Sequence, residues 1–491
     1  MVTRSTSSFG LVGTDWQQRI NWERLRKYRL NRARESMKRN GLGALLAMYD
    51  ENVRYVTSTV TPGWCRLKPG LRYALLCEGA EPVLFEQGDI GIQINRHCPW
   101  IPRDNVRYAY SWIKGAVGGA SRQQVKKFTN AIVEEMKKYG VDKAPLGVDF
   151  IDLNMINAFK EAGINWTDGA SPMVEARAIK NEDELEAMRI VAAICDGCHT
   201  AISHFMKPGM QEHQITAFAM NFLYNIPGIE DVEDIIVSSG PNSWPNWRHF
   251  SDRIIQPGDL VIIDMAAVTW NGYKSCMYRT YCAGKKPTQE QRDYYNIAYE
   301  WLYRAIDKVT PGATTKEIAE VWPSAMATWG YKEEDQAAAN LWGHGLGLAQ
   351  YDTPVISRIY SLDFPVEIRP GMSFALETQH GKPLQWGVRL EEMMVVTEKG
   401  PEVTTQFPIE EITVIDFPLP DITELSMLLD RIIEEVKGSQ KVAIELSPEG
   451  REPLLKAALG LTYGEAENVF AKILVQRGKL DAGDVPHVFA E

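Results

Sequence analysis

The sequence predicts an α/β domain, followed by a larger α+β domain and a helical C-terminal extension. Three observations support this prediction. Short apolar runs alternate with amphipathic segments in the first third of the chain, a pattern typical of an α/β domain. A β-hairpin pattern with an Asn271-Gly272 turn lies near the middle of the chain, and this dipeptide is a strong hairpin signal. With 491 residues, the chain is also too long for a single hydrophobic core.

The composition excludes several classes of partner. Hydrophobic residues make up 45% and charged residues 24% of the chain, as in ordinary soluble proteins. The net charge of −11 argues against binding to nucleic acid or to an anionic membrane. The N-terminal segment lacks the apolar stretch of a secretory signal, and no run approaches the ~20 apolar residues of a membrane span. We therefore expect a cytoplasmic protein with seven reduced cysteines.

The first domain is expected at residues 1–175. It begins with an amphipathic helix over residues 17–40, and the basic residues of this helix are interpreted as a solvated face. A long helix is expected at Gln123–Tyr139. Four short strands are expected at Ala44–Tyr49, Tyr73–Leu76, Pro82–Glu86 and Leu146–Asp149.

The second domain is expected at residues 176–417 and begins with a strong helix signal. Asn181 is a natural N-cap, and the acidic residues that follow it favour the positive end of a helix dipole. We therefore expect a helix from Glu182 to about Met206. The next expected elements are a helix at Glu212–Tyr224, a strand at Asp234–Ser239 and a loop rich in tryptophan and proline at residues 238–253.

One cysteine pattern within the first of these helices has two readings. Cys195, Cys198 and His199 have the spacing of a c-type haem attachment site. They also lie inside a strongly helical pattern, in a chain without an export signal. We interpret the spacing as a coincidence on a helix.

The central hairpin extends over Asp259–Gly284. Its first strand contains Asp264 directly after the apolar run 260–263, so this carboxylate is expected to be buried. A buried carboxylate requires a metal ion, a cation or several hydrogen-bond donors. Asp264 is therefore the first candidate site residue.

The rest of the second domain supplies further polar candidates. Two helices, at Gln289–Val309 and Thr315–Trp329, precede three polar segments at residues 343–357, 369–381 and 387–397. The candidate side chains in these segments are His344, Glu377, Arg389 and Glu391. The extension at residues 418–491 begins with a linker, and its pair Thr462 and Glu465 forms a capping box before a helix at Ala466–Arg477.

The order of these motifs resembles one family. Six motifs follow one another along the chain: an I-K-x-E-x-E-L helix signal, a histidine-bearing loop, the Asp264 hairpin, and the GHGLG, PGM-x-F-x-x-E and G-x-R-x-E-E segments. This order resembles the pita-bread family, which includes methionine aminopeptidase, aminopeptidase P, prolidase, creatinase and the dimethylsulfoniopropionate lyases. The resemblance covers about residues 176–417, and the first domain is similar to that of creatinase and prolidase. The residues after Pro420 lie outside it.

The resemblance implies a site for metal ions. In metal-dependent members, two Asp, one His and two Glu hold a pair of divalent ions. These ligands fall on Asp264, Cys276, His344, Glu377 and Glu391, while His249 of the preceding loop contacts the substrate. Cys276 replaces the second Asp, and Tyr351 replaces a histidine of the family. We therefore expect either no cofactor or one divalent ion, Fe, Zn or Mn.

The spacing within the hairpin creates a second difficulty. With a two-residue turn, Cys276 pairs across from Ala267, so Asp264 faces the opposite side of the sheet. Asp264 and Cys276 share a face only if one extra residue forms a β-bulge, a device common beside active sites.

The expected function is a creatinase-like hydrolase of a C–N bond in a small cationic or zwitterionic metabolite. His249 is the expected general acid and base, with His344, Glu377 and Glu391 as further catalytic residues. The expected substrate-binding residues are Arg389, which suits a carboxylate, together with Trp247 and Tyr351. Glu377 and Arg389 have a second interpretation as a buried structural ion pair.

Three alternatives remain open. The chain could be a dimethylsulfoniopropionate-type lyase, an Xaa-Pro peptidase that needs a metal-activated water, or a non-catalytic binding protein of the same fold. Relatives of the creatinase type are commonly dimers, so we expect a homodimer that acts on a small-molecule substrate, without nucleic acid or membrane partners.

Overall fold

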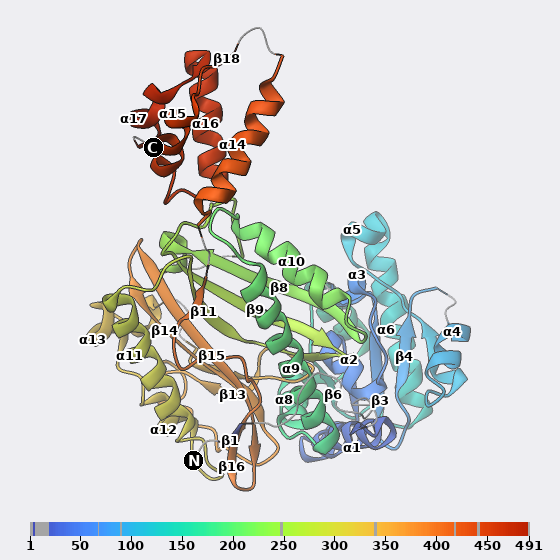
Figure 1. Ribbon diagram of the computed structural model, residues 1–491. Coiled ribbons are helices and arrows are strands. Elements are labelled where there is room, and N and C mark those ends of the chain that lie inside the picture. Colours follow the sequence, from blue (N-terminus) through green and yellow to red (C-terminus); the bar gives the residue numbers. More distant parts are fainter. Residues whose placement is uncertain are drawn as a thin grey trace.

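The computed structural model describes residues 3–4, 19–66, 68–88, 91–245, 249–337, 341–416, 419–438 and 442–489. Trp247, one of the residues expected to bind substrate, lies outside these ranges. Figure 1 shows the three parts that the sequence predicts: an α/β domain, a larger domain around two sheets, and a separate helical lobe at the C-terminus. No helix within the described ranges is long and apolar enough to cross a membrane.

The N-terminal domain contains a six-stranded sheet. Its strand order is β5 (Val106–Tyr108), β4 (Val83–Glu86), β3 (Tyr73–Cys77), β2 (Ala44–Ala47), β6 (Leu146–Val148) and β7 (Trp166–Asp168). Every residue of β2, β3, β4 and β6 is buried, as expected for strands covered on both faces. The helices of this domain include α1 (Trp22–Arg39), α2 (Asp50–Thr57), α6 (Ser121–Lys138) and α7 (Leu153–Ala162). The predicted strands and long helix of this domain are confirmed.

The second domain contains two sheets. The six-stranded sheet has the order β1 (Thr3–Arg4), β16 (Gly400–Val403), β15 (Trp386–Thr397), β14 (Ser373–Lys382), β12 (Gly343–Gly345) and β13 (Asp352–Ile356). The other has the order β10 (Tyr273–Lys274), β9 (Leu260–Trp270), β11 (Tyr278–Ala283) and β17 (Thr413–Ile415), and β8 (Ile229–Ser239) also pairs with β9. Hydrogen bonds between Thr280 and the backbone of Arg389 join β11 to β15, so the two sheets meet there.

Helices cover the outer faces of these sheets (Figure 1). They are α9 (Glu182–Phe205), α10 (Glu212–Tyr224), α11 (Gln289–Ile306), α12 (Thr315–Ala319) and α13 (Ala325–Trp329). The predicted cap of α9 is confirmed: the Asn181 side chain accepts a hydrogen bond from the Glu184 N–H at 3.0 Å, and the two residues form a capping box. Arg54 of α2 pairs with Glu230 of β8, which joins the N-terminal domain to the second domain.

The cysteine pair with haem-like spacing packs inside the protein. Cys195, Cys198 and His199 are all fully buried in α9, and His199 Nδ1 forms a 2.8 Å hydrogen bond with the Tyr281 hydroxyl. The side chains are therefore core residues, as the sequence analysis expected for a coincidental spacing.

Burial of His199 leads to a prediction about acid stability. Burial lowers the pKa of His199 to about 3, whereas an unfolded histidine has a pKa near 6.5. The unfolded chain therefore binds a proton that the folded chain excludes, and stability falls as the pH drops below 6.5, by about 3 kcal/mol at pH 4. Urea unfolding at pH 7 and pH 4 should show that His199→Gln loses about 3 kcal/mol less than the wild type. Parallel losses in both proteins would contradict the prediction.

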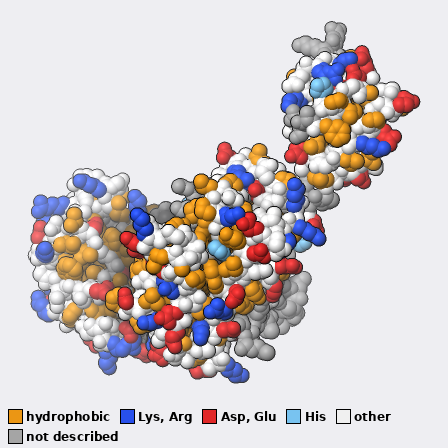
Figure 2. All heavy atoms as spheres, turned by 90° about the vertical axis from the view of Figure 1, so that its left-hand side faces the viewer, with side chains coloured by type: hydrophobic (Ala, Val, Ile, Leu, Met, Phe, Trp, Pro, Cys, Tyr) orange, Lys and Arg blue, Asp and Glu red, His pale blue; other side chains and the backbone are white. Residues whose placement is uncertain are grey.

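The C-terminal lobe has its own hydrophobic core. Its helices are α14 (Ile422–Val436), α15 (Pro448–Ala457), α16 (Tyr463–Arg477) and α17 (Val485–Phe489), and Leu428, Leu454 and Phe470 are buried among them. The predicted capping box of Thr462 and Glu465 is confirmed, although α16 begins at Tyr463 rather than at Ala466. Figure 2 shows the lobe projecting from the rest of the molecule.

Candidate functional site

A β-bulge in the central hairpin orients Asp264. Next to the turn, Trp270 pairs with Tyr273, whereas farther along the strands Asp264 pairs with Tyr278. The register changes by one residue between these pairs, and Ala267 has a φ of 55°, an uncommon value for a residue with a side chain. One extra residue in β9 therefore places Asp264 on the same face as Cys276. This is the bulge that the sequence analysis required.

Three further strands contribute polar side chains to one face of the other sheet. In β14 and β15, Glu377 lies opposite Glu391, and Gln379 lies opposite Arg389. His344 of β12 lies opposite Ala375. The alternate residues Leu376, Val388 and Leu390 pack in the hydrophobic core on the opposite face. The strand period of two therefore brings Glu377, Arg389 and Glu391 together on the face that does not pack against this core.

Three of these residues form a group that fits one metal ion. Ligand atoms of Cys276, His344 and Glu391 all lie within 4.8 Å of one another, and all three residues are buried. In the described part of the chain, neither carboxylate oxygen of Glu391 has a nitrogen or oxygen hydrogen-bond partner, and the neighbouring donor is the Cys276 thiol. Thiolate, imidazole and carboxylate together suit Zn²⁺ or Fe²⁺. This donor set fits one such ion, and Cys276 supplies no carboxylate to bridge a second.

The other two expected ligands face an arginine. Arg389 Nη2 donates a hydrogen bond to Glu377 Oε2, and its guanidinium carbon lies 4.0 Å from the centre of the Tyr278 ring. Arg389 was expected to bind a substrate carboxylate, but in the structure it binds the carboxylate of Glu377. Burial raises the pKa of Asp264 to about 7, opposed by a hydrogen bond from Tyr278 and by the charge of Arg389.

The remaining groups favour neutral forms when no cation is present. Burial raises the pKa of Glu391 well above its usual value, and the nearby charges of Glu377 and Asp264 raise it further. Burial likewise raises the pKa of the Cys276 thiol and lowers the pKa of the His344 imidazole. A bound cation reverses this preference for Glu391 and Cys276, because metal ligands must be deprotonated. Metal binding at this site is therefore expected to release protons.

The ion pair of Arg389 and Glu377 leads to a stability prediction. Arg389→Leu is expected to lower the free energy of unfolding by about 3–5 kcal/mol, because it leaves a buried carboxylate without its cation. Adding Glu377→Gln to that variant should recover part of the loss. Urea unfolding measures both effects, with Arg304→Leu as control, because the Arg304–Glu300 pair is exposed and should contribute about 1 kcal/mol or less. Equal losses for Arg389→Leu and Arg304→Leu would refute the assignment.

Two predicted substrate-contacting residues lie at exposed positions. The His249 side chain is 71% exposed, and its Nδ1 lies 2.6 Å from Asp234 Oδ1. Asp234 pairs with Ala266 in the β8–β9 ladder, two residues from the pair of Ile236 with Asp264, so it shares the face of Asp264. Tyr351 is 68% exposed, and its ring centre lies 4.7 Å from that of His344. His249 and Tyr351 thus flank the buried carboxylates.

Sequence reasoning missed Asp234, and strand alternation turns Glu392 away from the site. Asp234 stands at the start of a predicted strand. The alternation of side chains along this strand, which pairs with β9, is the signal that Asp234 faces the same side as Asp264. Glu392 is adjacent to Glu391 in the G-x-R-x-E-E segment but does not join the site. It instead faces the opposite side of β15, where it accepts hydrogen bonds from Arg279, Tyr303 and Thr405. Its alternation with Glu391 along β15 explains the difference.

The arrangement of the two sheets, with a buried carboxylate-rich site between them, defines the pita-bread class of protein. Residues 186–398 match metallopeptidase family M24, and residues 29–179 match the creatinase/prolidase N-terminal domain. The chain therefore belongs to the pita-bread M24 family and carries a creatinase-type N-terminal domain. Residues 423–491 match the second domain of SpoVK-like AAA ATPases.

Several curated proteins and solved structures are similar to this chain. The Xaa-Pro dipeptidase of Pyrococcus furiosus is 32% identical over 233 residues, 47% of this chain and 64% of that protein. The probable dipeptidase PepE of Mycobacterium tuberculosis is 26% identical over 66% of this chain and 78% of its own length. The dimethylsulfoniopropionate lyase DddP of Roseovarius nubinhibens is 24% identical over 79% of this chain and 87% of its own length.

The structural comparison agrees on the fold. The structure of an Xaa-Pro dipeptidase from Bacillus anthracis superimposes with a TM-score of 0.63 at 21% identity, covering 79% of this chain and 99% of that one. The prolidase of Pyrococcus horikoshii superimposes with a TM-score of 0.60 at 22% identity, covering 78% and 99%.

Proposed function

We propose that the chain is an M24-type hydrolase that cleaves the C–N bond of a small, dipeptide-sized amide with one metal ion. The observation that carries this proposal is the group of Cys276, His344 and Glu391, whose ligand atoms lie within 4.8 Å of one another. Relatives named as dipeptidases support a peptidase-type activity better than the creatinase-like activity that the sequence analysis placed first. The creatinase-like reading is therefore replaced by its peptidase alternative.

The same three residues would hold the ion. When bound, a divalent ion in such a site polarises the scissile carbonyl and lowers the pKa of water. The hydrophobic surroundings of the site strengthen every charge interaction within it. Glu377 and Asp264 remain with Arg389 and Tyr278, so the guanidinium supplies positive charge where relatives of the family place a second ion.

His249 is assigned to proton transfer. Because Asp234 accepts a hydrogen bond from Nδ1, the Nε2 atom of the imidazole is left to accept or donate a proton. An exposed imidazole beside the buried carboxylates is well placed to protonate the leaving amine. Tyr351, next to His344, is assigned to contact the substrate at the same opening. Trp247 stays an assignment from the sequence.

A second candidate function is a lyase that removes a proton beside a substrate carboxylate. The similarity to DddP covers 79% of this chain, which is the observation that favours it. Against it, the sequence resemblance places lyase carboxylates at positions that are Ala266 and Cys276 here. The homodimer also remains a proposal, and light scattering of the purified protein measures it directly.

One experiment separates the two functions. The purified protein, loaded with Zn²⁺ or with Fe²⁺, is incubated with a panel of Xaa-Pro and other dipeptides and, separately, with dimethylsulfoniopropionate. Release of free amino acids is expected, together with one bound ion per chain by elemental analysis. Release of dimethyl sulfide without dipeptide cleavage would favour the lyase. No turnover of either substrate class would refute both.

A further inference from the structure

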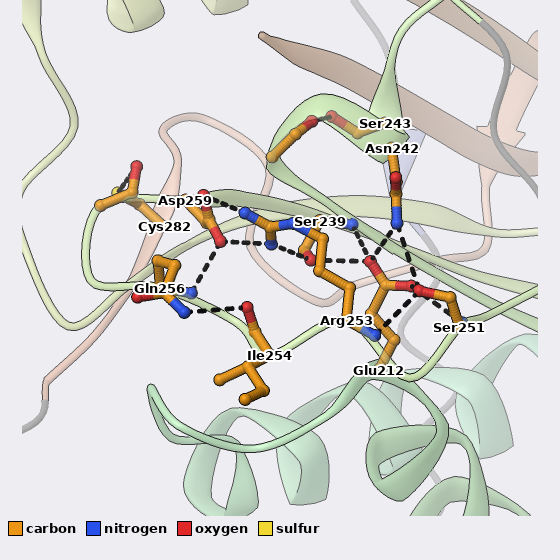
Figure 3. A network of polar contacts seen from close by, with 12 residues as sticks. Glu212, Ser239, Asn242, Ser243, Ser251, Arg253, Ile254, Gln256, Asp259 and Cys282 are labelled. Carbon is orange, nitrogen blue, oxygen red and sulfur yellow. Dashed lines mark hydrogen bonds and ion pairs between the residues drawn. The ribbon is translucent and has the colours of Figure 1, made fainter. Parts of the chain in front are cut away.

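The polar network in Figure 3 is built around Glu212, the first residue of α10. Glu212 is only 1% exposed. Burying a carboxylate costs free energy unless hydrogen bonds compensate. The partners that satisfy Glu212 are neutral donors at both ends of the loop that carries His249, and this pattern suggests a role beyond simple packing.

The two carboxylate oxygens of Glu212 bind different ends of this loop. Oε1 accepts hydrogen bonds from the N–H and the hydroxyl of Ser239, both at 2.7 Å, and from Asn242 Nδ2 at 3.4 Å. Oε2 accepts hydrogen bonds from the N–H of Ser251 at 2.9 Å and from its hydroxyl at 2.6 Å. One side chain therefore joins the residue before the loop to the residue after it.

A second pair of side chains reinforces this closure. Arg253 Nη1 donates hydrogen bonds to Ser239 Oγ and to Asp259 Oδ2, both at 2.6 Å. Gly240 has a φ of 48°, and a Cβ there would lie 2.6 Å from Asp259 Oδ1 and 2.7 Å from Arg253 Nη2. A side chain at Gly240 would therefore push against the Arg253–Asp259 ion pair, which Figure 3 shows beside Ser239.

We infer that Glu212 is a positioning residue, which fixes Ser239 and Ser251 on either side of His249 and so keeps His249 beside the site. This inference rests on the proposed role of His249 in proton transfer. Among the described residues, His249 contacts β8 twice: its carbonyl accepts a hydrogen bond from the Val237 N–H, and its ring contacts Asp234. Fixing Ser239 and Ser251 relative to each other removes chain conformations that compete with this placement.

Replacing the Glu212 carboxylate by an amide tests this inference. Both oxygens of Glu212 receive N–H and O–H donors, whereas a glutamine offers one acceptor oxygen and one NH₂ donor group. Glu212→Gln keeps the shape but places a donor against the donors of one loop end. That end then loses its acceptor, and a buried donor without a partner is costly. The variant should therefore open one end of the loop.

A matched control variant exists in the N-terminal domain. Asp149 is also a buried carboxylate, and it accepts hydrogen bonds from the N–H groups of Met48 and Tyr49 and from Asn52 Nδ2. Asp149→Asn therefore repeats the same chemical change away from the His249 loop. Ser251→Ala is a second variant at the same contact. It removes the hydroxyl that donates to Glu212 and accepts from Asn242 Nδ2 and the Arg253 N–H, but it keeps the Ser251 N–H donor.

The experiment combines hydrogen exchange with kinetics on the full-length, metal-loaded protein. In Glu212→Gln, amide exchange at residues 239–251 is expected to accelerate at least tenfold, with a smaller effect in Ser251→Ala and none there in Asp149→Asn. We expect kcat for the dipeptide substrate to fall about 10- to 100-fold with KM and bound metal unchanged. In a His249→Ala background, Glu212→Gln should cause no further loss of kcat, because both act through one group.

The outcomes separate this inference from the proposed function. Unchanged exchange at residues 239–251 in Glu212→Gln overturns the positioning role, whatever the activity of the wild type. An additive loss of kcat in the double variant overturns the link through His249. Dipeptide turnover by the wild-type protein is measured independently and tests the proposed function alone.

Discussion

His344→Ala is expected to abolish binding of the single metal ion and, with it, turnover. His344 is one of the three residues, with Cys276 and Glu391, that would hold the proposed ion. Loss of residues that only support ligands typically weakens metal binding by about 10–100-fold, so loss of a direct ligand should exceed about 100-fold. Elemental analysis after dialysis measures this directly. His380→Ala is the matched control, because His380 of β14 stacks on Tyr294 on the opposite face of the sheet and should leave the ion bound.

Cys276 provides an independent readout of the same site. With Co²⁺ in place of the native ion, a thiolate ligand produces a charge-transfer absorption band in the near ultraviolet. We expect this band in the wild type and its loss in Cys276→Ser. Two ions per wild-type chain, or a cobalt spectrum that Cys276→Ser leaves unchanged, would refute a single-ion site with a thiolate ligand.

His249→Ala is expected to lower kcat for the dipeptide substrate by about 10²–10⁴-fold, the usual contribution of a general acid or base. The physical reason is its geometry: Asp234 holds Nδ1 at 2.6 Å, which leaves Nε2 for proton transfer. Steady-state kinetics at saturating substrate measures the effect. His204→Ala is the control, because His204 is an exposed histidine of α9 whose Nδ1 contacts the backbone of Thr200, and it should leave kcat unchanged. A loss of less than about fivefold in His249→Ala would show that another group transfers the proton.

Local sequence signals predicted the elements of the fold because they act over a few residues. The Asn271-Gly272 turn is confirmed between β9 and β10, and the N-cap at Asn181 is confirmed at the start of α9. The buried run before Asp264 is confirmed as strand β9. Each of these depends on backbone conformation or on hydrogen bonds between near neighbours in the chain, which the residue types alone determine.

Contacts between distant segments determine which of the polar residues lie together in the site. The bulge at Ala267 turns Asp264 toward Cys276, and no local rule required it, because an unbulged register was equally consistent with the turn. The pairing of β14 with β15 brought Glu377 within reach of Arg389 and turned Glu392 away.

The sequence by itself determined which residues could form the site: a histidine loop, a hairpin carboxylate and a thiol in place of a second carboxylate. Only the tertiary structure decided their division into two groups, with Cys276, His344 and Glu391 on one side and the Arg389–Glu377 pair on the other. The physical reason is that strand register and sheet packing, rather than residue type, determine which buried charges lie close enough to neutralise each other.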